Sequence, residues 1–160
     1  LDPWHNPVSV AKATVVTWLL LNVYKTGERL HKMKKAKTPE CVSCSAPIED
    51  QLHFAFQCST FLEIRSQYMS KFIEPCPTIT QYLSDQKLLL LALLDPFSPF
   101  LSDNIKEGWK SKEEAYKLSR NYFFDLHKKR EKVMDTISTK KSEPEDDDTT
   151  EIIISVYKNI

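Results

Sequence analysis

The sequence predicts a mostly α-helical fold: a small helical domain built around a cluster of cysteine and histidine residues, with a disordered acidic tail. Three observations predict it. Apolar residues recur every three to four positions in several segments, which is the period of an amphipathic helix. Only two glycines accompany nine prolines in 160 residues, so the glycine-bearing turns of β-hairpins are scarce. Three of the four cysteines and one histidine fall within residues 41–58.

Two helical segments precede these cysteines. Ser9 can cap a first helix over residues 9–24, along which apolar residues recur at helical spacing. We expect Gly27 to end or break this helix. The basic stretch over residues 25–37 is predicted to form a second helix. Residues 1–40 are therefore predicted to hold an N-terminal helix and a basic helix.

The cysteine and histidine residues have a metal-binding spacing. Cys41, Cys44, His53 and Cys58 follow the pattern Cys-x2-Cys-x8-His-x4-Cys. Three thiolates and one imidazole fill a closed tetrahedral shell around Zn²⁺ and leave no position for a reactive water. The alternative is chance spacing of buried cysteines, which a set this regular disfavours. We predict a structural zinc knuckle over residues 41–58.

The spacing of His53 and Cys58 also constrains the backbone. On an unbroken α-helix, residues five apart would project about 140° away from each other. Both side chains can face one metal ion only if the helix stops or bends near Cys58. Thr60-x-x-Glu63 is a capping-box pattern, which predicts that a new helix starts just after Cys58.

Residues 59–137 are predicted to form a helical bundle. A short helix is expected over residues 78–83, and a strongly apolar helix, central to the core, over residues 87–94. Ser111-x-x-Glu114 is another capping box, and it opens the longest predicted helix, which carries an apolar stripe as far as residue 137.

The C-terminal segment, residues 138–160, is predicted to be an acidic, disordered tail. Residues 143–151 contain six acidic residues and no basic one, a composition that cannot bury enough apolar surface to fold. Residues 152–157 have strong β character, but the sequence offers them no evident partner.

Four phenylalanine side chains could lie either in the core or on the surface. Phe97 and Phe100 lie in a proline-bearing loop over residues 95–102, which we expect to hold both rings against the helices. Phe54 and Phe56 flank the predicted metal site. Both could form its small core, and aromatic rings there could also stack on unpaired bases. Core is favoured for Phe56, and for Phe54 both roles stay open.

Charge is unevenly distributed along a chain whose formal net charge is zero. Residues 1–42 carry seven Lys and Arg against three Asp and Glu. Lys25 and His31 belong to this basic stretch, and its predicted phosphate contacts are Arg29, Lys32, Lys34, Lys35 and Lys37. The alternative is a solvated helix face. A second basic cluster, over residues 127–132, is balanced by acids and is predicted to be a surface helix face.

Cysteine usage favours a reducing, intracellular compartment, without distinguishing nucleus from cytoplasm. Cys76 is left outside the metal pattern and is predicted to be an unpaired thiol. No apolar run reaches the roughly 20 residues that span a membrane. The sequence lacks a glycine-rich phosphate loop, a nucleophile elbow and paired catalytic aspartates. We therefore expect the chain not to be an enzyme.

The metal pattern and its surroundings resemble a known family. The residues that carry the resemblance are Cys41-Val-Ser-Cys44, Glu49-Asp50, His53-Phe54, Cys58, Phe61 and Arg65. They are similar to the zinc-binding region that follows the polymerase in non-LTR retrotransposon reverse transcriptases. Similar segments continue downstream, at residues 94–99 and 118–132, so the resemblance spans roughly residues 8–137.

The resemblance implies a zinc-binding, nucleic-acid-binding accessory module of an endonuclease and reverse transcriptase polyprotein. Such a module helps to hold template RNA or target DNA during target-primed reverse transcription. The parent would be an RNA-directed DNA polymerase, and its upstream polymerase domain would be a partner. The alternatives are a zinc-stabilised protein-interaction module and a non-functional relic of a transposon. The oligomeric state is not predicted.

Overall fold

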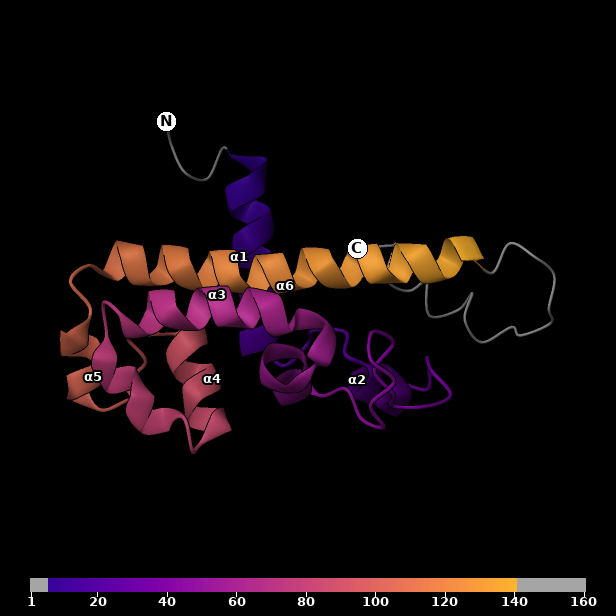
Figure 1. Ribbon diagram of the computed structural model, residues 1–160, viewed down its shortest axis with the longest axis horizontal. Helices are drawn as coiled ribbons and strands as arrows, with labels where there is room; N and C mark the ends of the chain where they lie inside the picture. Colours follow the sequence, from indigo (N-terminus) through magenta and orange to yellow (C-terminus); the bar gives the residue numbers. More distant parts are fainter. Residues whose placement is uncertain (1–5, 141–160) are drawn as a thin grey trace.

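Helices form the described part of the chain, which is residues 6–140 of the computed structural model (Figure 1), and no strand occurs within it. The elements are α1 (Pro7–Leu20), α2 (Gly27–Lys32), a π-helix η2 (His53–Gln57), a 3-10 turn η3 (Ser59–Phe61), α3 (Leu62–Ile73), a 3-10 helix η4 (Pro77–Tyr82), α4 (Gln86–Leu94), α5 (Asp103–Gly108) and α6 (Lys112–Lys140). The predicted helical class is confirmed. The tail was predicted to begin at residue 138, but α6 continues to Lys140; the rest of the predicted tail, with the β-like segment 152–157, lies outside the described residues.

The long helix α6 is the element on which the rest is assembled. Its 29 residues make it about 43 Å long. Helices α1, α3 and α4 and the π-helix η2 all contact it. Figure 1 shows α3 running alongside α6, while α1 crosses it steeply. The predicted apolar stripe is confirmed, since its members Ala115, Tyr122 and Leu126 are fully buried.

Both ends of α1 differ from the prediction. The helix starts at Pro7, and the Asn6 side chain caps it by accepting a hydrogen bond from the Val8 amide at 3.0 Å. Ser9 is therefore not the cap, because proline at the first position fixes the start two residues earlier. The helix ends at Leu20, and Asn22 follows it in the left-handed conformation, at φ 53°.

A second correction concerns the basic stretch, which is not one helix. Thr26 caps α2, with its hydroxyl accepting the Arg29 amide, so Gly27 opens a helix rather than ending one. Lys34 has φ 57°, and the amides of Lys34 and Lys35 bond to the carbonyls of His31 and Leu30. This is a Schellman motif, which stops the helix at Lys32.

The predicted short helix and apolar helix of the bundle are present as η4 and α4. Ser111 caps α6 as predicted, with its hydroxyl accepting the Glu114 amide at 3.3 Å. Helix α5 was not predicted. The loop over residues 95–102 holds Phe97 against Tyr116 of α6, but the prediction for Phe100 is wrong, because that ring is 82% exposed.

The remaining cysteine, Cys76, is a free and buried thiol, as predicted. Its sulfur lies 3.5 Å from the carbonyl oxygen of Ile105, in the bundle. Within residues 6–140, no helix combines the length and the apolar character that crossing a bilayer requires.

Candidate metal centre

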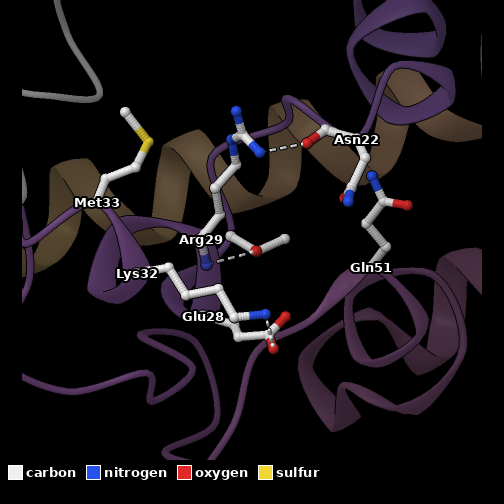
Figure 2. A pocket seen from close by; sticks show the side chains of 7 residues that line it. Asn22, Glu28, Arg29, Lys32, Met33 and Gln51 are labelled. Carbon is white, nitrogen blue, oxygen red and sulfur yellow. Dashed lines mark hydrogen bonds and ion pairs between the residues drawn. The ribbon is translucent and has the colours of Figure 1, made fainter.

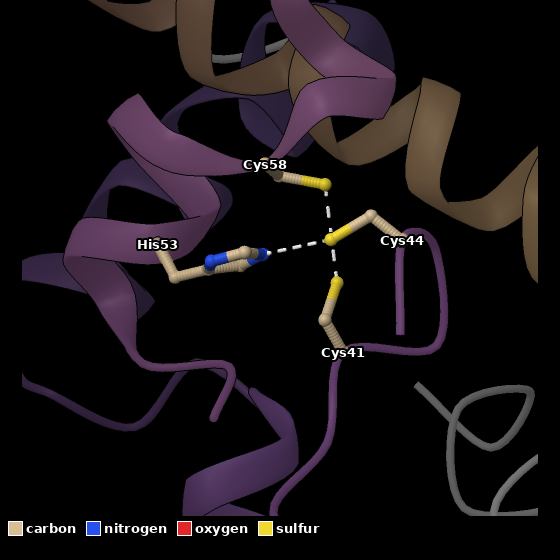
Figure 3. Close-up of side chains that lie close together, drawn as sticks. All are labelled: Cys41, Cys44, His53 and Cys58. Carbon is tan, nitrogen blue, oxygen red and sulfur yellow. Dashed lines mark hydrogen bonds between the residues drawn. The ribbon is translucent and has the colours of Figure 1, made fainter. Parts of the chain in front are cut away.

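The structure brings the four predicted ligand residues together. One donor atom from each of Cys41, Cys44, His53 and Cys58 can be chosen so that all four lie within 4.8 Å of one another. Figure 3 shows their side chains pointing toward one another from the turn at residues 41–44 and from the two ends of η2. Cys41, His53 and Cys58 are buried and Cys44 is partly buried, so the site is largely closed to water.

The distances fit a tetrahedral zinc ion. The sulfurs of Cys41 and Cys58 are 3.9 Å apart, and the sulfur of Cys44 lies 3.3 Å from Nε2 of His53. Around a tetrahedral Zn²⁺ with bonds of about 2.3 Å to sulfur and about 2.0 Å to nitrogen, these separations would be about 3.8 Å and about 3.5 Å. The three sulfurs and one nitrogen therefore suit zinc as the bound cofactor.

A tight turn presents the first two sulfurs. The Ser45 amide donates to the Cys41 carbonyl, and the Cys41 amide donates to the Ala46 carbonyl, both at 2.8 Å. Ser45 has φ 58°, which reverses the chain after Cys44. The Thr60 hydroxyl donates to the Ser43 carbonyl at 2.8 Å. Thr60 therefore fastens this turn and does not cap α3, whose first turn has no side-chain cap.

A π-helix brings His53 and Cys58 to the same side of the chain, despite their separation of five residues. The carboxylate of Asp50 accepts the His53 amide at 2.7 Å and caps the segment. The Cys58 amide then donates to the His53 carbonyl at 2.8 Å. This bond joins residues five apart, so the two ligand residues face the same side. Cys58 itself is extended, with φ −60° and ψ 119°, which confirms the predicted end of the helix there.

Buried side chains from two helices satisfy the carbonyls around this break. Tyr122 of α6 donates its hydroxyl to the Ala55 carbonyl at 2.6 Å. Arg65 of α3 donates to the Cys58 carbonyl, also at 2.6 Å. The Ala55 carbonyl lies where helical hydrogen bonding stops and needs such a partner, and the Cys58 carbonyl accepts the Phe61 amide at 3.2 Å in addition to Arg65. Arg65 thus supports the backbone of a ligand residue.

A buried ion pair joins the metal centre to α6. Glu49 is fully buried and Arg130 is 3% exposed. Arg130 donates to both carboxylate oxygens of Glu49, at 2.8 Å from Nε and 2.6 Å from its terminal nitrogen. The Gly27 amide donates to the same carboxylate at 2.6 Å, and the Cys41 sulfur lies 3.9 Å from it. Glu49 therefore touches a metal-site cysteine, the start of α2 and the long helix.

Gly27 is required by this arrangement. A Cβ atom there would lie 2.4 Å from the Glu40 carbonyl oxygen and 2.8 Å from that of Pro39. Both obstacles are backbone atoms, which cannot swing aside. Glycine lets the first turn of α2 pack closely against the backbone of Pro39 and Glu40 and hydrogen-bond to Glu49.

The electrostatics of the centre call for a cation. The hydrogen bond between the two sulfurs raises the pKa of Cys41 and lowers that of Cys58, while burial and the charge of Glu49 raise the pKa of Cys41 further. A second thiolate beside Glu49 is therefore unfavourable without compensation. Zn²⁺ supplies the positive charge that stabilises it, and Arg130 balances Glu49.

The predicted basic residues gather around α2 with different surroundings. Arg29 is half-buried and donates to the Asn22 carbonyl at 2.6 Å, and Lys32 pairs with Glu28 at 2.6 Å. Lys34, Lys35 and Lys37 are exposed, in the segment between α2 and Cys41. Burial first, and then the positive charge of Lys35, lowers the pKa of Lys25.

Two predictions beside the centre are now decided. Phe54 is fully buried and packs against Tyr24 and Phe61, which confirms its core role and removes it as a stacking platform. The second basic cluster is not simply a surface face, because Arg130 is buried and Nδ1 of His127 shares a hydrogen bond of 3.0 Å with the Tyr24 hydroxyl. Lys128 and Lys129 of that cluster are exposed.

Fold and site together define a helical zinc-binding module. Residues 3–64 match the family model described as zinc-binding in reverse transcriptase. The matched segment contains all four residues of the centre and ends in the first turn of α3. It does not include α6, which supplies Tyr122 and Arg130. No curated protein and no solved structure matches the chain.

Proposed function

We propose that this chain is the accessory module of a non-LTR retrotransposon reverse transcriptase that holds template RNA or target DNA through its phosphates. Cys41, Cys44, His53 and Cys58 act as the four ligands of a structural zinc ion. The lysines around α2 act as the phosphate contacts. The match of residues 3–64 to the reverse transcriptase family supports the first part of this proposal, and the parent's polymerase and endonuclease activities follow from the same resemblance.

The observation that carries the nucleic-acid part is the link between α2 and the metal centre. Glu49 binds the first amide of α2 and also contacts Cys41. Zinc therefore fixes the position from which Arg29, Lys32 and the following lysines project. Such contacts are made with phosphates and do not read sequence.

Salt dependence tests this function. Affinity of the zinc-loaded chain for single-stranded RNA and DNA is measured across salt concentrations, for wild type and for Lys34→Gln/Lys35→Gln. Loss of two phosphate contacts should lower the magnitude of the log–log salt slope by about 1.4 on single strands. The control is Lys110→Gln/Lys117→Gln, which removes the same charge from exposed positions near the start of α6. Absence of binding at low salt, or equal losses in both variants, would refute the proposal.

One observation favours the alternative of a protein-interaction module. Apolar side chains at both ends of α1 are exposed, namely Val8, Val10, Leu20, Leu21 and Val23. The partner would be the upstream polymerase domain of the same polyprotein. Under this alternative, Leu21→Asp weakens association with that domain supplied in trans and leaves binding to nucleic acid unchanged. Under the nucleic-acid proposal alone, neither interaction changes.

A further inference from the structure

A small polar pocket lies where α1 ends and α2 begins (Figure 2). Its volume is about 160 Å³, and Asn22, Arg29, Met33 and Gln51 are among the residues that line it. Pockets for drug-sized ligands measure roughly 300–1,000 Å³, so this one admits a single ring system and not a whole nucleotide. None of the four residues of the metal centre lines it, but two of the phosphate contacts proposed above, Arg29 and Lys32, do.

Two amide side chains in the pocket keep hydrogen-bonding capacity. Gln51 donates from Nε2 to the Leu19 carbonyl at 2.9 Å, which leaves its Oε1 as an acceptor. The side-chain amide of Asn22 makes no hydrogen bond within the described part of the chain, and so offers a donor and an acceptor. Asn22 is held there by the Schellman motif that ends α1, in which its own amide bonds to Leu19 and the Val23 amide to Trp18.

The rest of the lining suits a planar, largely neutral group. Arg29 lines the pocket and donates one N–H to the Asn22 carbonyl, and a guanidinium can stack on an aromatic ring. Met33 adds a polarizable thioether and is 43% exposed. The charges of Lys32 and Glu28 neutralise each other at 2.6 Å, which favours a ring with polar edges over a bare phosphate.

We propose that this pocket receives one unpaired nucleobase of a single-stranded nucleic acid. The amides of Asn22 and Gln51 pair with the polar edge of the base, and Arg29 and Met33 contact its ring. Lys34 and Lys35, which follow Met33 directly and are exposed, hold the neighbouring phosphates. A base in a duplex cannot enter such a pocket, so single strands, loops and ends are the preferred ligands. This inference rests on the proposed function.

The test compares two ligands of equal length and charge: a single-stranded oligonucleotide, and a chain of the same phosphates and sugars without bases. Wild type should bind the base-bearing chain about tenfold more tightly, the usual contribution of one recognised base. Asn22→Gly keeps the left-handed backbone and should remove most of that preference while leaving affinity for the abasic chain unchanged. Gln51→Met should also reduce the preference.

Gln67→Met, at an exposed position of α3, is the matched control and should retain the preference. Zinc content and helicity verify that each variant is folded. The pocket proposal is overturned if wild type binds both chains equally, or if neither pocket variant changes the ratio of affinities. In both cases phosphate binding survives. If neither chain binds to wild type, the proposed function fails and the pocket assignment fails with it.

Discussion

Replacing Arg130 by methionine should destabilise the zinc-loaded protein by about 3–5 kcal/mol, the usual cost of leaving one partner of a buried ion pair alone. The magnitude follows from the surroundings of Glu49. That carboxylate is fully buried and loses two hydrogen bonds, at 2.8 and 2.6 Å. Within residues 6–140, the hydrogen-bond partners left to its side chain are the Gly27 amide and the Cys41 sulfur. Because a bound zinc site with three thiolates is itself negative, zinc affinity should also fall, by about tenfold or more.

Urea unfolding of the zinc-loaded chain gives the change in stability, and competition with a chelator gives zinc affinity. The matched control is Arg120→Met. Arg120 lies on the same helix, is only half-buried, and donates to the Tyr116 carbonyl at 3.2 Å. Its replacement should cost about 1 kcal/mol or less.

The double variant Glu49→Gln/Arg130→Met separates charge from packing. Glutamine keeps an acceptor for the Gly27 amide but carries no charge, so the double variant should be more stable than Arg130→Met alone. Neighbouring residues that share one interaction are expected to be non-additive in this way. The reasoning is refuted if Arg130→Met costs no more than Arg120→Met, or if the second substitution brings no recovery.

Three further predictions follow from the same contacts. Gly27→Ala should destabilise the protein by about 1–3 kcal/mol or more, because the alanine Cβ would lie 2.4 Å from the Glu40 carbonyl oxygen. Unfolding in denaturant measures this loss of stability. A neutral effect would contradict the close approach of the two backbone segments. Burial lowers the pKa of His127, so the unfolded state takes up the proton first and stability should fall as pH drops below about 6.5. His127→Gln should reduce that loss between pH 8 and pH 5.5, and equal losses in both proteins would count against it. A peptide of residues 3–64 should bind zinc at least about tenfold more weakly than the full chain, since it lacks Tyr122 and Arg130; equal affinity by chelator competition would show that α6 is dispensable.

The metal centre could be predicted from sequence because its ligands are local. Four residues within 41–58 carry the whole donor set, and closed Cys/His shells have few other uses. The same spacing also required the backbone to depart from an α-helix before Cys58. It could not reveal that a π-helix provides this departure, since such turns are rare and follow from the tertiary contacts around them.

The ion pair between Glu49 and Arg130 of α6 was not predicted, because the two residues are 81 positions apart in the sequence. Glu49 is buried against Arg130, whereas its neighbour Asp50 accepts the His53 amide at the helix start. A signal for Arg130 was nonetheless present. It lies four residues after Leu126 and three before Val133, within the apolar stripe of the long helix. A charged residue at such a position predicts a buried partner.

Helix ends were predicted less well, because in each case another local feature determined where the helix starts or stops. Ser9 and Asn6 are both good capping residues, but Pro7 favours the earlier start. Gly27 is the only glycine before residue 108 and therefore suggested a helix end. The left-handed position after α1 is filled by Asn22, and the glycine is needed for close approach to the Glu40 carbonyl.

X-ray absorption at the zinc edge of the 160-residue chain, purified under reducing conditions, tests the central claim most directly. The account predicts one zinc ion per chain with three sulfur ligands at about 2.3 Å and one nitrogen ligand at about 2.0 Å. Cys44→Ser should change this pattern. A first shell dominated by oxygen, or a reduced protein that retains no zinc, would contradict it.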